Sequence, residues 1–156
     1  MQLQGYEYPR IRNEQELLDN LRVQLGKAND TEYSDAEWKK ILEEIAGKAL
    51  TMEDKAAMIQ KENTAISIDR DNGLKTNVHL VHKDNIFKNR LQVINQYVPE
   101  GGTHSNRYDV TILVNGLPLV HIELKRRGVS IKEAFNQINL YARESFCAGK
   151  GMFYYI

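Results

Sequence analysis

The stretch RYDVTILVNGLPLVHIELKR, residues 107–126, alternates apolar and polar residues on either side of an Asn-Gly pair. Alternation about a short turn sequence predicts a β-hairpin, because successive side chains of a strand point to opposite faces of the sheet. We place a three-residue loop at 115–117, which sets Val114 opposite Pro118. The hairpin is therefore the centre of the predicted fold.

The register of this hairpin decides which charged side chains meet. With the three-residue loop, Asp109 stands opposite Glu123, and the two share one face of the hairpin. His121 and Lys125 lie on that face as well. The other face carries apolar side chains and is expected to be buried: Val110, Ile112, Val114, Val120, Ile122 and Leu124. A two-residue loop would turn Asp109 away from Glu123, so the predicted site depends on the register.

Two carboxylates and an ammonium group in one small area suit the metal-dependent hydrolysis of a phosphodiester. Asp109 and Glu123 offer the hard oxygen ligands that Mg²⁺ prefers, and the carbonyl of Leu124 is a further candidate ligand. Lys125 can orient the attacking water or stabilise the negative charge that develops on the phosphate. An Asp…Glu-x-Lys pattern alone is common in unrelated chains, so the surrounding sequence has to support this hypothesis.

The composition is that of an ordinary globular protein, and 156 residues are enough for one domain with its own core. No apolar run could cross a bilayer, the first ten residues hold no secretory signal, and the single cysteine, Cys147, agrees with a reducing cytoplasm. The net charge is zero, but residues 101–156 carry more basic than acidic residues, which favours a phosphate-contacting surface there. No G-x-x-x-x-G-K-[ST] motif occurs, so ATP hydrolysis is not expected.

The remaining sequence divides into a helical first part and a second part dominated by strands. Capping-box patterns predict helices that begin at Asn13 and Ser34, and Thr51 begins a third. A further helix is predicted to follow the central hairpin from Ser130. Alternating runs predict additional strands, over 64–82 with a turn at 71–73, over 90–98 and over 151–156.

The spacing Asp-x(13)-Glu-x-Lys on a hairpin followed by a helix resembles the PD-(D/E)xK nuclease motif. Residues 106–146, with RYDVTILVNGLPLVHIELKRRGVSIKEAFNQINLY at their centre, closely resemble the nuclease domain of the R subunit of type I restriction enzymes. The stretches GYEYPR, KENTAISI and NRLQVINQYV fit that family too, so the resemblance spans essentially the whole chain.

The resemblance implies roles for particular residues. Asp109, Glu123 and Lys125 would be the cleavage residues, with Asp109 and Glu123 holding Mg²⁺. Gln137 and Tyr141 stand at the Q-x-x-x-Y motif of the family and would contact the substrate or support Lys125; from the residues alone, a solvated Gln137 and a core Tyr141 fit as well.

For other residues near the predicted site, the sequence leaves two interpretations open. Glu62 is a further acidic candidate that could approach the metal, although an ordinary solvated charge at a helix end explains it equally well. For His121 a structural role is favoured over one in lining the site. Arg126 and Arg127 could hold DNA phosphates, or could simply be exposed at a strand end.

The fold implied by the resemblance is an α/β, restriction-endonuclease-like domain with a mixed β-sheet flanked by helices and a helical N-terminal extension. Residues 1–62 would form the helical part and residues 63–156 the nuclease core of the same domain. The implied partners are double-stranded DNA and the methyltransferase and specificity subunits of a restriction complex. ATP would be used only by the motor domains of the full-length subunit, which this chain lacks.

Two other functions remain compatible with the sequence. The chain could be a non-cleaving DNA-binding or coupling module of the same complex, which the near-neutral charge favours and the intact Asp109, Glu123 and Lys125 set opposes. It could also be a stand-alone nuclease that cuts branched DNA structures.

Overall fold

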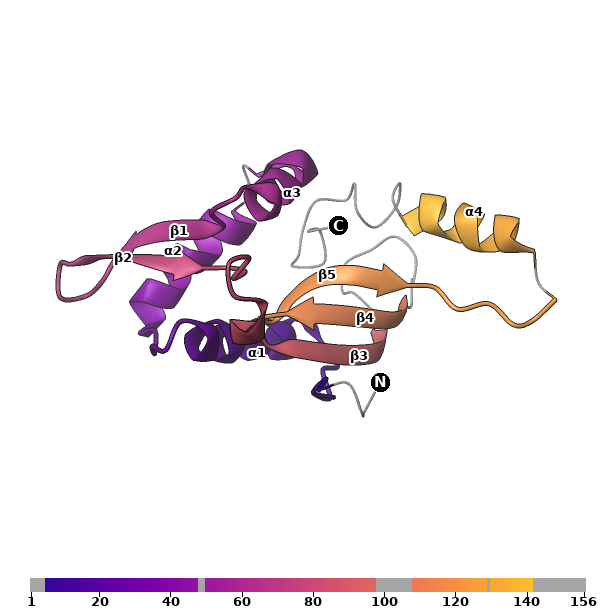
Figure 1. Cartoon of the computed structure of the whole chain (residues 1–156), viewed down its shortest axis with the longest axis horizontal. Coiled ribbons are helices and arrows are strands. Elements are labelled where there is room, and N and C mark those ends of the chain that lie inside the picture. The colour runs from indigo at the N-terminus through magenta and orange to yellow at the C-terminus, as the bar shows by residue number, and fades with distance from the viewer. Residues whose placement is uncertain (1–4, 48–49, 98–107, 129, 142–156) are drawn as a thin grey trace.

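A computed structural model describes residues 5–47, 50–97, 108–128 and 130–141. Within these residues the strands form two antiparallel sheets, β1–β2 and β3–β4–β5, accompanied by helices (Figure 1). The elements in chain order are α1 (Glu14–Ala28), α2 (Asp35–Ala46), α3 (Met52–Gln60), β1 (Ala65–Asp69), β2 (Lys75–His79), the 3₁₀ turn η2 (Ile86–Lys88), β3 (Leu91–Tyr97), β4 (Tyr108–Val114), β5 (Leu117–Ile122) and α4 (Ile131–Tyr141). The predicted α/β fold class is confirmed.

The helix starts follow the predicted caps. The side chain of Asn13 accepts a hydrogen bond from Glu16 N at 2.8 Å, which begins α1. Ser34 and Thr51 each form a complete capping box at the start of α2 and α3. None of the helices within the described residues is long and apolar enough to span a membrane.

The sheet pairing differs in one respect from the mixed sheet that was expected. All the named strands pair antiparallel, and the parallel pairing within the described residues is limited to a bridge between Glu7 and Gln92. In that bridge Glu7 N donates to Leu91 O at 2.9 Å and Val93 N donates to Glu7 O at 2.8 Å. The first residues of the described chain therefore extend the edge of β3 in parallel.

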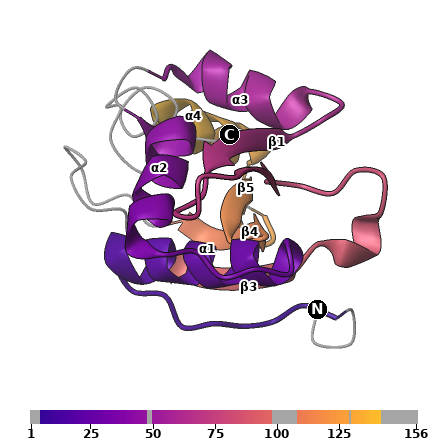
Figure 2. The same ribbon diagram turned by 90° about the vertical axis from the view of Figure 1, so that its left-hand side faces the viewer.

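Helix α1 packs against the β3–β4–β5 sheet near the β4–β5 turn, where Gly116 lies beside the backbone of Leu21, and Figure 2 shows α1 in front of this end of the sheet. The side chains of Leu21 and Leu113 are fully buried in this core. Asn20 donates to the side chain of Gln92 at 2.8 Å, and Gln92 pairs with Leu113 across β3 and β4. The face that carries Gln92, Thr111 and Leu113 is thus the inner face of this sheet.

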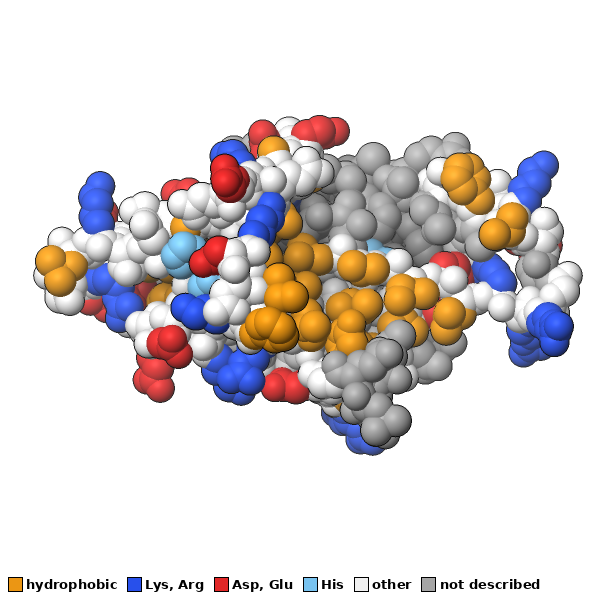
Figure 3. All heavy atoms as spheres, viewed as in Figure 1, with side chains coloured by type: hydrophobic (Ala, Val, Ile, Leu, Met, Phe, Trp, Pro, Cys, Tyr) orange, Lys and Arg blue, Asp and Glu red, His pale blue; other side chains and the backbone are white. Residues whose placement is uncertain are grey.

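The prediction that the opposite face of the hairpin is buried holds only in part, because Val110, Ile112, Val114 and Ile122 are half-buried while Val120 and Leu124 are exposed. The face that carries Val110, Ile112 and Val120 is turned away from α1, and Val120 is 43% exposed, while Thr111 on the inner face is 1% exposed. Figure 3 shows apolar side chains gathered on the surface over β3, β4 and β5. Strand alternation distinguishes two faces but does not say which of them a helix covers.

The turn between β4 and β5 connects the two sheets. The side chain of Asn115 is fully buried; it donates to Leu80 O just after β2 at 2.9 Å and to Asn89 Oδ1 at 2.9 Å. Its Oδ1 accepts from Arg90 N at 2.7 Å, immediately before β3. One polar side chain thus bonds the end of the first sheet to the start of the second, which satisfies backbone groups that no strand partner reaches.

Candidate active site

The hairpin turn is one residue shorter than predicted. Asn115 and Gly116 have φ of 52° and 85°, and Val114 pairs with Leu117 rather than with Pro118. Two successive residues with positive φ are typical of a two-residue type I′ turn, for which Asn-Gly is the preferred sequence. The three-residue loop at 115–117 was therefore a wrong prediction, and by itself a two-residue loop would separate Asp109 from Glu123.

A β-bulge restores the predicted register. Leu113 pairs with Pro118, but Ile112 pairs with Val120, so Leu119 is an extra residue in β5. From Ile112 outward the pairing is the predicted one, and it continues as Thr111 with His121 and Val110 with Ile122. The next step of this register sets Asp109 opposite Glu123.

Hydrogen bonds join three of the predicted site side chains at this end of the hairpin, and a fourth, Asp109, is bonded to the backbone beside Glu123. Asp109 Oδ2 accepts from the backbone N–H of Leu124 at 2.8 Å, immediately after Glu123. Lys125 Nζ donates to Glu123 Oε1 at 2.8 Å and also to Gln137 Oε1. The site therefore joins β4, the segment that follows β5, and α4.

The acidic side of this site is largely removed from water. The side chain of Glu123 is 7% exposed and that of Lys125 is 27% exposed. A carboxylate in such a position needs a cation beside it, because an unpaired buried charge is strongly destabilising. In this structure the ammonium of Lys125 supplies that cation.

The donor set fits a hard divalent cation. The register places two carboxylates on one face here, and the hydrogen bonds that hold them use Asp109 Oδ2 and Glu123 Oε1. Mg²⁺ is commonly bound through one or two carboxylates and takes its other ligands from water and phosphate. Among the described residues no group of three or more His, Cys, Asp or Glu side chains could hold a metal, so a protein-only cage is not formed there.

Comparison with known proteins identifies the family. The family description "Type I restriction enzyme R protein N terminus" matches residues 1–156, the whole chain. The chain belongs to this family.

Relatives of this chain carry names that agree with the match. It is 46% identical to the type I restriction enzyme EcoprrI endonuclease subunit of Escherichia coli, over 98% of this chain and 49% of the relative. It is 40% identical to the SsaAORF53P endonuclease subunit of Staphylococcus saprophyticus and 38% identical to the SauMSSORF170P endonuclease subunit of Staphylococcus aureus, over 97% of this chain and 16% of each relative. The chain thus spans half or less of the relatives that it matches.

Two of the predicted residues have no described contact with the site. Glu62 is exposed between α3 and β1, and no hydrogen bond or ion pair within the described residues joins it to Asp109, Glu123 or Lys125. Tyr141 ends α4, but its side chain lies outside what the structure describes, as do the predicted strand at 151–156 and Cys147.

The contacts that sequence reasoning missed are mainly backbone ones. The hydrogen bond from the Leu124 N–H to Asp109 could not be predicted from the pattern of side chains, because its donor is a backbone group. Thr111 Oγ1 lies 2.8 Å from His121 Nδ1, two cross-strand pairs inward from Asp109 and Glu123 and on the same face. This contact supports the structural role favoured for His121, and the register alone could have found it. Arg126 and Arg127 are exposed beside the site.

Proposed function

We propose that this chain is the nuclease part of a type I restriction endonuclease subunit and that it hydrolyses phosphodiester bonds of double-stranded DNA with Mg²⁺. The observation that carries the proposal is the meeting of Asp109, Glu123 and Lys125 at one end of the β4–β5 hairpin. The names of the relatives as endonuclease subunits support the same activity.

Asp109 and Glu123 are the residues that would hold the metal, with the carbonyl of Leu124 as a further oxygen ligand. A bound Mg²⁺ supplies polarisation of the phosphoryl group and lowers the pKa of a coordinated water. The Leu124 N–H fixes one carboxylate oxygen of Asp109, which orients the other oxygen without the entropy cost of an unrestrained side chain.

We assign to Lys125 the stabilisation of the negative charge that develops on the phosphoryl oxygens during cleavage. Its ammonium group is held by Glu123 on one side and by Gln137 on the other, so its position is set before the substrate arrives. A positioned cation in a partly dehydrated site stabilises the negative charge on the phosphoryl oxygens far more than one in bulk water. Gln137 therefore acts as a positioning residue through Lys125, and Tyr141, one helical turn later, is proposed to support the same side of α4.

The proposed activity belongs to a larger assembly. We propose that the methyltransferase and specificity subunits read the DNA sequence, that motor domains of the full-length subunit use ATP, and that this chain cuts without reading bases. We also retain the division into a helical part, 1–62, and a nuclease core, 63–156, within one domain. The continuous core that contains Leu21 of α1 and Leu113 of β4 supports a single unit.

One observation favours the non-cleaving alternative. Glu123 already forms an ion pair with Lys125, and a carboxylate neutralised by an ammonium group attracts a cation less strongly. Titration of the chain with Mg²⁺ by calorimetry separates the two functions. Binding that Asp109→Ala abolishes supports the nuclease, whereas an unchanged signal or no binding supports the coupling module.

Plasmid cleavage by the full-length subunit in its complex tests the nuclease directly. We expect Lys125→Ala to abolish cleavage while ATP hydrolysis and translocation persist, because Lys125 acts only at the cutting site. Lys132→Ala, which removes an exposed lysine from the first turn of α4, is the matched control and should cut normally. Normal cleavage by Lys125→Ala would contradict the proposed role.

A further inference from the structure

The 3₁₀ turn η2 exposes two adjacent apolar side chains far from the candidate active site. Phe87 is 93% exposed and Ile86 is 66% exposed. Single exposed apolar residues are common on protein surfaces, but an adjacent pair that includes an almost fully hydrated aromatic ring is unusual and often marks a contact site. Figure 3 shows apolar side chains gathered over η2 as well as over the neighbouring sheet.

The exposure of this turn does not come from a loose backbone. Asn85 caps the turn by accepting from Phe87 N at 3.2 Å. The side chain of Asn89 accepts from His82 N at 2.9 Å, donates to His82 O at 2.7 Å, and accepts from the buried Asn115 at 2.9 Å. The turn is thus fixed at both ends, and it presents Phe87 to solvent in a preformed geometry.

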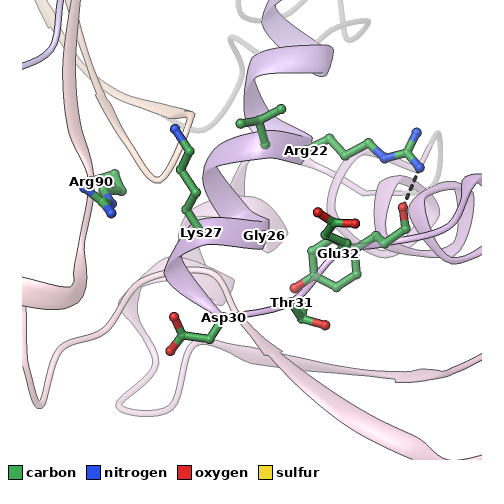
Figure 4. Close-up of a pocket in the computed structure, with 9 residues that line it drawn as sticks. Arg22, Gly26, Lys27, Asp30, Thr31, Glu32 and Arg90 are labelled. Carbon is green, nitrogen blue, oxygen red and sulfur yellow. Dashed lines mark hydrogen bonds between the residues drawn. The ribbon is translucent and has the colours of Figure 1, made fainter.

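Cationic residues neighbour the exposed ring in the sequence. Residues 83–90 hold three cations and a single carboxylate, Asp84, and Lys88 and Arg90 are both exposed. Arg90 also lines a pocket next to Lys27 of α1, where the two cationic side chains stand on the same side of the pocket (Figure 4). We call Phe87, Ile86, Lys88, Arg90 and Lys27 the η2 surface.

We propose that the η2 surface is a second DNA-binding site, in which Lys88, Arg90 and Lys27 contact backbone phosphates and Phe87 packs against a base that is exposed at an open or kinked step. Aromatic rings flanked by cations bind nucleic acid in this way, since every base offers a flat face and every phosphate a charge. The positive charge around the ring favours this polyanionic partner over a protein surface.

The η2 surface is separate from the cutting site. Arg90 is bonded to Asn115 at the turn of the β4–β5 hairpin, whereas Glu123 lies just beyond the other end of β5. Six strand residues at about 3.3 Å each place the two regions roughly 20 Å apart along the hairpin. Contacts at both would hold DNA at two points, which restrains its orientation at the scissile phosphate. The inference takes its partner, DNA, from the proposed function.

Fluorescence anisotropy of labelled DNA, titrated with the 156-residue chain, tests the inference. Two DNAs are used, a blunt duplex and a single strand of equal length. We expect Phe87→Ala to weaken binding at least about fivefold, with the larger effect on the strand whose bases are open. Lys88→Ala and Arg90→Ala should weaken binding to both DNAs and lower the salt dependence by about one released ion each.

Two variants in the β1–β2 turn provide a matched control. Leu74 is 65% exposed and is followed by the exposed Lys75, so Leu74→Ala and Lys75→Ala remove an exposed apolar group and an exposed cation elsewhere. These variants should bind DNA like the unaltered chain. Because the altered side chains of the η2 surface project into solvent, the thermal unfolding midpoint should not change in either set.

The outcomes separate this inference from the proposed function. DNA binding by Phe87→Ala that equals the Leu74→Ala control overturns the η2 site and leaves the nuclease proposal intact. Weaker assembly of Phe87→Ala with partner subunits at unchanged DNA affinity also overturns it, in favour of a protein contact. Failure of the unaltered 156-residue chain to bind either DNA contradicts this inference. Loss of cleavage by the full complex carrying Lys125→Ala, with ATP hydrolysis and translocation retained, would still support the proposed cutting site.

Discussion

Asp109 and Leu124 are joined across the hairpin by a hydrogen bond of 2.8 Å from the Leu124 N–H to Asp109 Oδ2. The bond lies just beyond the last pair of the ladder, Val110 with Ile122, so a side chain continues the pairing where the backbone ladder stops. It gives Asp109 two separable properties. The carboxylate holds the end of β5 in register, and it supplies a charge to the proposed metal site.

Substitutions at Asp109 should separate these two properties. Asp109→Asn keeps an acceptor for Leu124 N but removes the charge, so cleavage should be lost with an unchanged unfolding midpoint. Asp109→Ala removes both and should lower stability by about 1 kcal/mol, the usual value of one partly exposed hydrogen bond. Plasmid cleavage and thermal unfolding of the two variants provide the comparison. Cleavage by Asp109→Asn at the unaltered rate would show that the charge is not needed.

Gln137 should influence cutting only through Lys125. Gln137→Ala removes an acceptor from the ammonium of Lys125, and we expect cleavage to fall by about tenfold, less than in Lys125→Ala. Gln137→Glu retains an acceptor and should restore most of the activity, which a merely structural role in α4 would not predict. Asn136→Ala, at the neighbouring exposed position, is the control. Equal activity of the Ala and Glu variants would refute the positioning role.

Much of the site could be predicted from the sequence because strand alternation is strict. Once residues 107–126 are taken as a hairpin, the shared face of Asp109 and Glu123 follows from the register. The predicted loop length was wrong, and the correct length would have separated the two residues. The two residues still share a face because Leu119 is an extra residue in β5, and the alternation of the local sequence does not predict where a strand takes an extra residue.

The local sequence pattern also could not predict which face of the sheet a helix covers. The apolar alternation of Ile112 and Val120 predicted a buried face, but α1 packs on the face of Thr111 and Leu113. Tertiary contacts over long sequence separations decide this choice. Glu62 is exposed between α3 and β1, and its role at the site stays a prediction.

Acid should destabilise the fold through Glu37. The pKa of this buried carboxyl is held below its ordinary value, chiefly by the N–H groups of Asp71 and Ser34 that donate to it, and also by Arg70. A group with a lowered pKa in the folded chain stabilises it above the unfolded pKa of about 4.3, and this stabilisation is lost as the pH falls through the lower, folded value. We expect Glu37→Gln to unfold at lower temperature at pH 7 and to show a smaller further loss below about pH 4.3. Glu43→Gln, at an exposed position in α2, should follow the unaltered chain, and a common pH profile for all three would contradict the assignment.

Asn115 should be the most sensitive polar residue for the connection between the sheets. Asn115→Asp keeps the acceptor for Arg90 N but loses both side-chain donor contacts, to Leu80 O and to Asn89. Asn115→Gly tolerates the positive φ but loses every one of these side-chain bonds. Leaving buried backbone groups unsatisfied costs about 1–3 kcal/mol each, so we expect a loss of roughly 2–4 kcal/mol in both variants by urea unfolding. A loss below 1 kcal/mol in Asn115→Gly would show that water replaces these bonds without penalty.

Gly116 should be intolerant of any side chain, for two reasons that a matched variant can separate. Its φ of 85° favours glycine, and a Cβ there would lie 2.6 Å from the Cα of Leu21, a backbone atom of α1 that cannot move aside. We expect Gly116→Ala to cost roughly 2–5 kcal/mol, the sum of backbone strain and overpacking. Gly73 has a similar φ of 80° but open space around it, so Gly73→Ala should cost only the strain, about 1 kcal/mol. Equal losses in urea unfolding would mean that the contact with Leu21 is not tight. A larger loss in Gly116→Ala, accompanied by lost DNA cleavage, would show that the packing of the turn on α1 also sets the register at Asp109 and Glu123.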